Sequence, residues 1–134
     1  MSIVNQTKKT MSTCISNFAK EYDKNNLEVQ LLIKSDYEFI PSYYLLINNK
    51  NEKQITFNEI LNVKIDFLGR EMIVKPFISN TLRKLSKEQN CSPSEMNILI
   101  YNRNKKDDVS LYFFIDTKPI KAISFDYIFE ELSM

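Results

Sequence analysis

The first segment of the chain has the periodicity of an amphipathic helix. Ile15, Phe18 and Tyr22 recur at helical spacing, and the charged residues of this segment fall mostly at other positions. This pattern predicts a helix over about residues 6–24. We expect the asparagine pair that starts at Asn25 to end it, because asparagine tolerates the left-handed conformation better than most residues.

Apolar positions then change to the spacing of strands. Leu27, Val29, Leu31 and Ile33 alternate with Glu28, Gln30 and Lys34, and residues 43–47 form a short continuous apolar run. Both patterns predict strands, with an asparagine-rich turn at 48–51 after the second. Thr56 and Glu59 have the spacing of a helix capping box, which predicts a short helical element there.

A hairpin is the next predicted element. Residues 63–67 alternate, Gly69 follows, and residues 72–75 are again mostly apolar, so the only glycine of the chain is placed in the turn. Pro76 is expected to end this second strand, and Ser79 to cap a helix that follows it.

The last third of the chain predicts a second set of strands. Ser92 and Glu95 flank a proline at capping-box spacing, so a short helical turn is expected to precede them. The predicted strands are 97–101, 109–115 and 120–125. Turn residues at 116–119 separate the last two, and a closing helix is predicted from about residue 126.

The order of elements over residues 62–115 resembles a ubiquitin-like β-grasp. The segments that carry the resemblance are VKIDFLGREMIV and LRKLSKEQNCSPSEMNILIY, a hairpin followed by a charged helix, a turn and an apolar strand. The resemblance implies a scaffold for protein recognition. A generic α+β meander accounts for the same order equally well.

Composition favours one folded domain. The chain has 134 residues, 43% of them hydrophobic and 12% aromatic, and it shows no linker or internal repeat. We predict a single α+β domain over 1–134, with an antiparallel or mixed sheet of six to eight strands and about three helices. The 14 asparagines, 16 isoleucines and 15 lysines share A/T-rich codons, which points to a bacterium with an AT-rich genome, or to its phages and mobile elements.

The same composition excludes several chemistries. One glycine leaves no phosphate-binding loop, and the absence of histidine removes Ser-His-Asp catalysis, Cys-His catalysis and histidine-ligated metal. Cys14 and Cys91 match no metal or redox spacing, and they favour a reducing cytosol, although one long-range disulfide stays open. No apolar run could span a bilayer. We therefore expect a cytoplasmic protein with no cofactor, no bound metal, no membrane contact and no enzymatic activity.

A metal-dependent nuclease is a remote alternative. Asp116 and Lys118 follow an apolar strand with the D-x-K spacing of restriction-type nucleases, in which the carboxylate binds the metal ion. A second carboxylate would have to come from Asp107, Asp108 or Glu95. An ordinary hairpin turn explains the same residues.

Nucleic-acid binding is a second alternative. Tyr112 and Phe114 alternate on one face of a strand, as stacking residues do in sheet-based RNA binders. Against it, the net charge is only +1 and acids at 107 and 108 neutralise part of the basic hairpin. The candidate basic residues are Arg83, Lys84, Lys87, Arg103, Lys105 and Lys106.

The main hypothesis rests on predicted strands that are apolar on both faces of the sheet, namely residues 43–47, 98–101 and 111–115. An antiparallel sheet with one solvated face should alternate between apolar and polar residues, and these strands are apolar on both faces. Either helices cover both faces, or one face meets another protein, itself or a different one. We expect a non-catalytic interaction module, either a mobile-element inhibitor or immunity protein or an adaptor or structural subunit of a larger assembly. The candidate interface residues are Tyr43, Tyr44, Tyr101, Tyr112 and Phe114.

Overall fold

A computed structural model describes residues 3–56, 59–60, 68–104 and 108–125 of the chain. The fold is α+β, with six strands in one antiparallel sheet of order β3-β2-β1-β4-β5-β6. The helices are α1 (Ile3–Glu21) and α3 (Leu68–Gln89), with a 3₁₀ turn η2 (Pro93–Glu95). The strands are β1 (Val29–Ser35), β2 (Pro41–Ile47), β3 (Lys50–Ile55), β4 (Met96–Asn102), β5 (Val109–Ile115) and β6 (Lys118–Ile123). None of the helices in the described residues is both long and apolar enough to cross a membrane.

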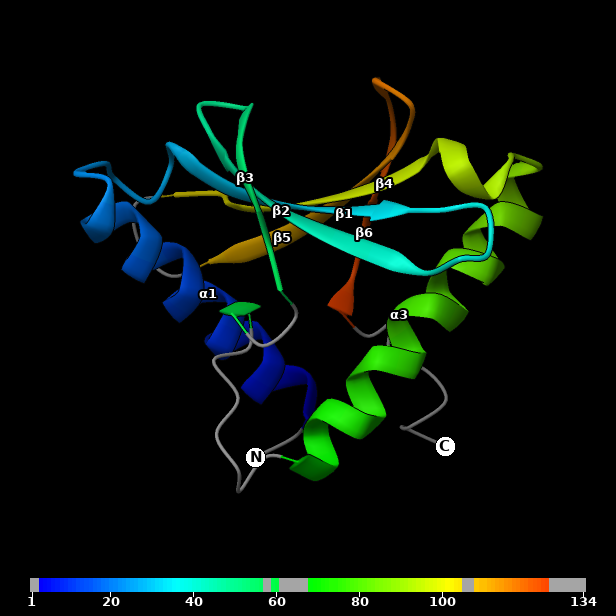
Figure 1. Cartoon of the computed structure of the whole chain (residues 1–134), viewed down its shortest axis with the longest axis horizontal. Helices are drawn as coiled ribbons and strands as arrows, with labels where there is room; N and C mark the ends of the chain where they lie inside the picture. The colour runs from blue at the N-terminus through cyan, green and yellow to red at the C-terminus, as the bar shows by residue number, and fades with distance from the viewer. Residues whose placement is uncertain (1–2, 57–58, 61–67, 105–107, 126–134) are drawn as a thin grey trace.

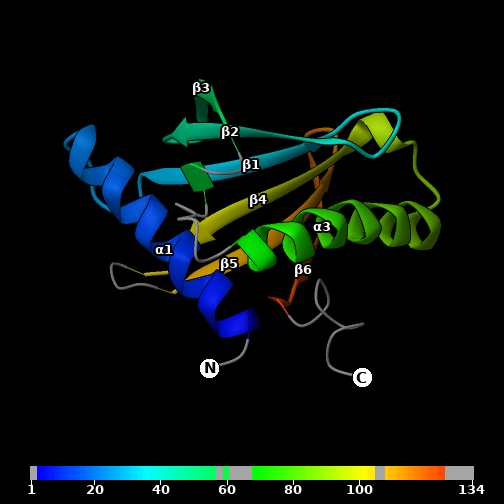
Figure 2. The same ribbon diagram turned by 60° about the horizontal axis from the view of Figure 1, so that its bottom comes forward.

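Both long helices lie against the same face of the sheet (Figures 1 and 2). Between them and the sheet lies the core, where Ile15 of α1 and Leu82 of α3 are completely buried beside Phe113 of β5. Each helix also reaches an edge strand of the sheet. Lys53 of β3 lies 5.3 Å from the ring centroid of Phe18, and the Lys121 ammonium of β6 lies 3.3 Å from the Glu88 carboxylate.

The described elements form two copies of one unit, a helix followed by a three-stranded meander. The sheet order is symmetric about its centre, so that β1, β2 and β3 correspond to β4, β5 and β6. Leu32 and Leu99 are equivalent residues of β1 and β4, and they are also directly paired across these strands. A pseudo-two-fold axis therefore passes through the sheet between these two leucines. The expectation of no internal repeat is wrong at the level of structure.

Equivalent local details recur about 67 or 68 residues apart. Register shifts occur at Leu45/Leu46 in the first meander and at Phe113/Phe114 in the second. The Asn48 N–H donates to the Glu28 carbonyl at 2.7 Å, and the Asp116 N–H donates to the Glu95 carbonyl at 2.6 Å. Eight of the twenty equivalent strand positions carry the same residue, so the sequence contains a signal of the repeat that the pattern of apolar and polar positions did not reveal.

The predicted hairpin around Gly69 is wrong. Residues 68–75 belong to α3, which continues through Pro76, and residues 61–67 lie outside the described part of the chain. A proline inside a helix costs about 3 kcal/mol. Burial of Ile78, Leu82 and Leu85 outweighs this cost, since each buried aliphatic side chain contributes about 1.5–3 kcal/mol. The β-grasp-like core is consequently not confirmed, and Ser79 lies inside the helix instead of capping it.

Other predicted boundaries need smaller corrections. Helix α1 ends at Glu21, and Asp23 takes the left-handed conformation expected of the asparagine pair, with φ of 55°. The Asn25 side chain instead accepts hydrogen bonds from the backbone N–H groups of Leu27 and Glu28. Strand β3 was not predicted, because five of its six residues are polar and exposed.

Several local predictions are confirmed. The Thr56 and Glu59 side chains each accept a hydrogen bond from the other's backbone N–H at 3.2 Å, and Ser92 and Glu95 also form a capping box. Strand β5 has the predicted bounds, and Asn48 and Asn49 both have positive φ in the β2–β3 turn. The predicted closing helix, from residue 126, lies outside the described residues.

Candidate protein-binding face

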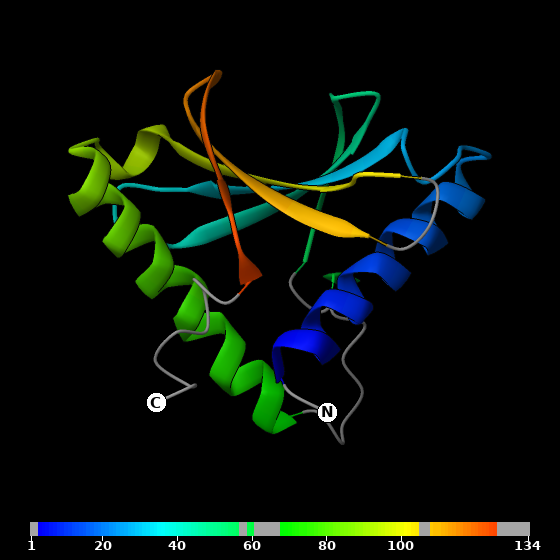
Figure 3. The ribbon, with the colours of Figure 1, turned by 180° about the vertical axis from the view of Figure 1, so that it is seen from behind.

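The face of the sheet opposite α1 and α3 is not covered by any described element (Figures 1 and 3). We call it the open face. Because side chains alternate along a strand, those that point away from the core lie on the open face, and most of them are half-buried. Its large apolar residues are Leu32, Tyr44, Leu46, Leu99, Tyr101, Tyr112 and Phe114.

The four inner strands that form this face are almost free of charge. Strands β2, β1, β4 and β5 have seven residues each, and Lys34 is the only Lys, Arg, Asp or Glu among them. Charged residues make up 26% of the whole chain. A solvated sheet face ordinarily alternates with polar and charged side chains. Depletion of charge together with enrichment of tyrosine and phenylalanine is typical of the centre of a protein interface.

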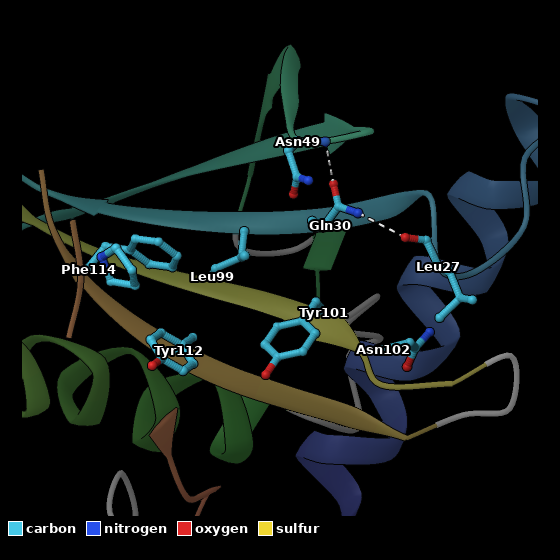
Figure 4. Close-up of a pocket in the computed structure, with 9 residues that line it drawn as sticks. Leu27, Gln30, Asn49, Leu99, Tyr101, Asn102, Tyr112 and Phe114 are labelled. Carbon is cyan, nitrogen blue, oxygen red and sulfur yellow. Dashed lines mark hydrogen bonds between the residues drawn. The ribbon is translucent and has the colours of Figure 1, made fainter. Parts of the chain in front are cut away.

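A shallow groove runs over the middle of the open face. It consists of two adjoining hollows of about 350 and 620 Å³, which share Asn49, Leu99 and Phe114. Figure 4 shows the first hollow, in which Tyr101 and Tyr112 lie beside Leu99. The rings of Tyr112 and Phe114 lie 5.6 Å apart and are tilted by 58°. Such tilted aromatic pairs offer both a rigid apolar surface and, through the tyrosine hydroxyl, a polar group.

Two amide side chains fix the hairpins that flank the groove. Gln30 accepts a hydrogen bond from the Asn49 N–H at 2.9 Å and donates one to the Leu27 carbonyl (Figure 4). Its equivalent in the second half, Asn97, donates to the carbonyls of Glu95 and Asp116. Both amides therefore hold a hairpin turn against the start of an inner strand, which gives the groove rigid sides.

One buried polar atom beside the groove is unsatisfied. The Asn102 side chain accepts a hydrogen bond from the Asp108 N–H at 3.2 Å, but its Nδ2 has no partner within the described residues. Asn102 is only 5% exposed and lines the first hollow. A buried amide donor without an acceptor is destabilising by about 1–3 kcal/mol, so an acceptor supplied from outside would be favourable here.

The open face contains four of the five predicted interface residues. Tyr44, Tyr101, Tyr112 and Phe114 lie on it, half-buried. Tyr43 points the other way, into the core, where it is 7% exposed. Burial raises the pKa of its hydroxyl, as expected for a group shielded from water.

Sequence reasoning missed the aliphatic part of this face. Leu32 was not singled out, and Leu46 and Leu99 were treated only as members of apolar runs, although all three alternate with core residues. Leu46 is 6% exposed but lies outside the main core cluster and lines the groove. Alternation with Ile98 and Ile100, which are core residues, would have identified Leu99.

The candidate basic residues of α3 do not share a surface with Tyr112 and Phe114. Arg83, Lys84 and Lys87 lie on α3, across the sheet from the open face, and the Arg83 guanidinium lies 5.4 Å from the Phe39 ring centroid. Arg103 forms an ion pair with Asp108 at 2.9 Å. This hydrogen bond holds the pKa of Asp108 below its usual range. Lys105 and Lys106 lie outside the described residues.

The D-x-K residues lie in a tight turn. Asp116 has φ of 54° in the β5–β6 turn, and Lys118 begins β6. Asp108 precedes β5 while Asp116 follows it, so the two acids lie at opposite ends of a seven-residue strand. Glu95 is nearer, but its carboxylate accepts a hydrogen bond from the Ser92 N–H. Asp107 is outside the described residues, and the described residues contain no group of three or more side chains suited to hold a metal ion.

Both edges of the sheet are unsuited to pairing with another strand. Strand β3 contains Lys50 and Lys53, and β6 contains Pro119 between Lys118 and Lys121. Lysine, proline and bulges at an edge oppose the addition of a further strand. A protein partner is therefore more readily accommodated on the open face than at an edge.

Comparison of the chain with protein-family models, curated proteins and solved structures finds no match.

Proposed function

We propose that the chain is a non-catalytic protein-binding module that works through its open face. The observation that carries this proposal is the near absence of charge on four adjacent strands, whose large outward side chains are leucine, tyrosine and phenylalanine. Leaving such a surface in water is unfavourable, because apolar area contributes roughly 25 cal/mol per Å² when it is removed from water. Contact with a partner would bury it.

Rigidity supports the same function. The floor of the groove consists of paired strands, and its flanking turns are held by the amides of Gln30 and Asn97. A surface that is already ordered loses little conformational entropy when it binds. Tyr44, Tyr101 and Tyr112 fit this role, since tyrosine combines a large apolar area with few rotatable bonds.

Both roles expected from the sequence would use such a surface. An inhibitor or immunity protein of a mobile element would cover a functional region of its target with it. An adaptor or structural subunit would use it to join neighbouring subunits. The identity of the bound protein separates the two roles.

Site-specific photocrosslinking tests the proposal. A photoreactive phenylalanine analogue replaces Tyr112 on the open face, and a matched variant carries it at Asn17, which is exposed on α1. In the cells that produce the protein, we expect a crosslinked protein adduct from position 112 and none from position 17. Mass spectrometry then identifies the adduct. Equal crosslinking from both positions, crosslinking to nucleic acid, or no adduct from position 112 would contradict the proposal.

A further inference from the structure

The open face has the shape of a saddle. The tips of the β2–β3 and β5–β6 hairpins rise on the open side, while the far ends of β3 and β6 turn toward the helices (Figures 1 and 3). Two diagonal corners of the sheet are thus raised and the other two are lowered. This is the expected result of the regular twist of an antiparallel sheet.

A saddle is complementary to a copy of itself. When the copy is turned over about an axis nearly parallel to the strands, its lowered corners meet the raised corners of the first, as in aligned packing of two twisted sheets. The operation is a single two-fold rotation about an axis in the plane of contact, so the resulting interface is isologous and closed. The pseudo-two-fold axis between Leu32 and Leu99 makes the two halves of each face offer similar contacts.

We propose that the occupant of the open face is a second copy of this chain, packed face to face with the strands of the two sheets nearly aligned. This inference rests on the proposed function and names its partner. Leu32 and Leu99 of both copies meet at the centre, surrounded by Tyr44, Tyr101, Tyr112 and Phe114. The near absence of charge suits burial against an identical surface, where charged groups would face like charges.

The available area approaches that of a standard interface. Six strands of six or seven residues give a flat footprint of roughly 650 Å², at about 4.8 Å between strands and 3.3 Å per residue. A stable interface buries about 800 Å² on each partner, so this footprint is about four-fifths of the usual area.

The position of Lys34 is compatible with this packing. It is the sixth residue of the seven in β1, close to one end of the face, and it is exposed. Its ammonium lies 6.0 Å from the ring centroid of Tyr44. A lysine near the rim can bury its aliphatic stem and keep its charge in water. The single charge of the inner strands therefore need not be desolvated on dimerisation.

Sedimentation equilibrium and light scattering over a range of concentrations test the inference. We expect the wild type to have twice the mass of the chain, and Leu32→Lys and Leu99→Lys to raise the dissociation constant at least about 100-fold, because each dimer would bury two unpaired ammonium groups. The matched control is Tyr37→Lys, which changes a 75%-exposed side chain in the β1–β2 turn and should leave the dimer intact. Circular dichroism checks that each variant is folded.

Hydroxyl-radical footprinting of the unmodified chain gives a second measurement that needs no variant. Oxidation of Tyr112 should fall at least several-fold between monomeric and dimeric concentrations, while oxidation of Tyr37 stays constant. A monomer at all concentrations, or a dimer in which Tyr112 stays reactive, would overturn self-association. If the monomer still crosslinks from position 112 to a different protein, the proposed function stands and only the second-copy occupant is wrong. No adduct at all would overturn both.

Discussion

The two cysteines have different surroundings and should differ in reactivity. Cys14 is 3% exposed, and its thiol donates to the Glu59 carbonyl at 3.4 Å. Burial, with a smaller contribution from the Glu59 charge, raises its pKa to about 12. Cys91 is half-buried, and burial also raises its pKa. Because only the thiolate reacts, Cys14 should stay inert in the folded chain at pH values where Cys91 begins to ionise.

We expect a disulfide-exchange reagent to label one thiol per folded chain between pH 8 and pH 10, at a rate that rises with pH. Cys91→Ser should abolish this labelling, and Cys14→Ser should leave it unchanged. In urea, both cysteines of the wild type should react. Two rapidly reacting thiols in the folded chain would contradict the burial of Cys14.

At the scale of elements, the loop before each meander is held by an equivalent glutamate. The Glu28 carboxylate accepts a hydrogen bond from the Asn25 N–H at 2.9 Å, and the Glu95 carboxylate accepts one from the Ser92 N–H at 3.2 Å. The two loops also receive the equivalent hydrogen bonds from the hairpin turns that flank the groove. Each carboxylate therefore connects the end of a helix to the start of an inner strand.

Glu28→Ala and Glu95→Ala should each lower the free energy of unfolding by about 1 kcal/mol, the usual value for loss of a capping side chain. If the two equivalent loops contribute equally to stability, the two losses in free energy of unfolding should agree within about 0.5 kcal/mol. Urea denaturation measures both. Glu52→Ala, which removes an exposed acid of the edge strand β3, is the control and should change stability by less than 0.5 kcal/mol. A large loss of stability in only one of the two variants would show that the equivalent loops contribute unequally to the free energy of unfolding.

Elements with a strong local signal were predictable from the sequence, and elements fixed by tertiary contacts were not. Strand β5 was predicted because Leu111 and Phe113 alternate with aromatic residues. Strand β3 forms only because it pairs with β2, and its polar sequence gives no sign of this. The start of α3 was mistaken for a hairpin because Gly69 and Pro76 are ordinarily turn residues. The preference of these two residues for turns is outweighed by the burial of apolar side chains further along the helix.

The sequence predicted which types of residue form the candidate site, but it did not predict all of the individual residues. Two-sided hydrophobicity correctly indicated that one face of the sheet would carry aromatic residues. It could not show which face the helices cover, so Tyr43 was assigned to the interface although it packs in the core. That Leu32 and Leu99 lie opposite each other at the centre of the face follows only from the strand register, which depends on contacts between residues far apart in the chain.

For the whole molecule, the distribution of charge bears on nucleic-acid binding. A single-strand binder needs aromatic side chains for stacking and cations for the backbone on one surface. Here Tyr112 and Phe114 lie on the open face, whereas Arg83 and Lys87 belong to a helix on the opposite side of the sheet (Figure 3). Lys34 is the only basic residue of the inner strands, so few counterions would be released by a bound strand.

Titration with fluorescent single-stranded RNA and DNA at 50 and 200 mM salt should therefore give no saturable binding at micromolar protein. A protein that makes six or more phosphate contacts would instead bind at the lower salt and lose about 10³-fold or more in affinity at the higher. Binding that Tyr112→Ala or Lys34→Ala weakens would contradict the protein-binding assignment and place nucleic acid on the open face. Binding that only Lys87→Ala weakens would place it on α3 and leave the open face available for a second copy of the chain.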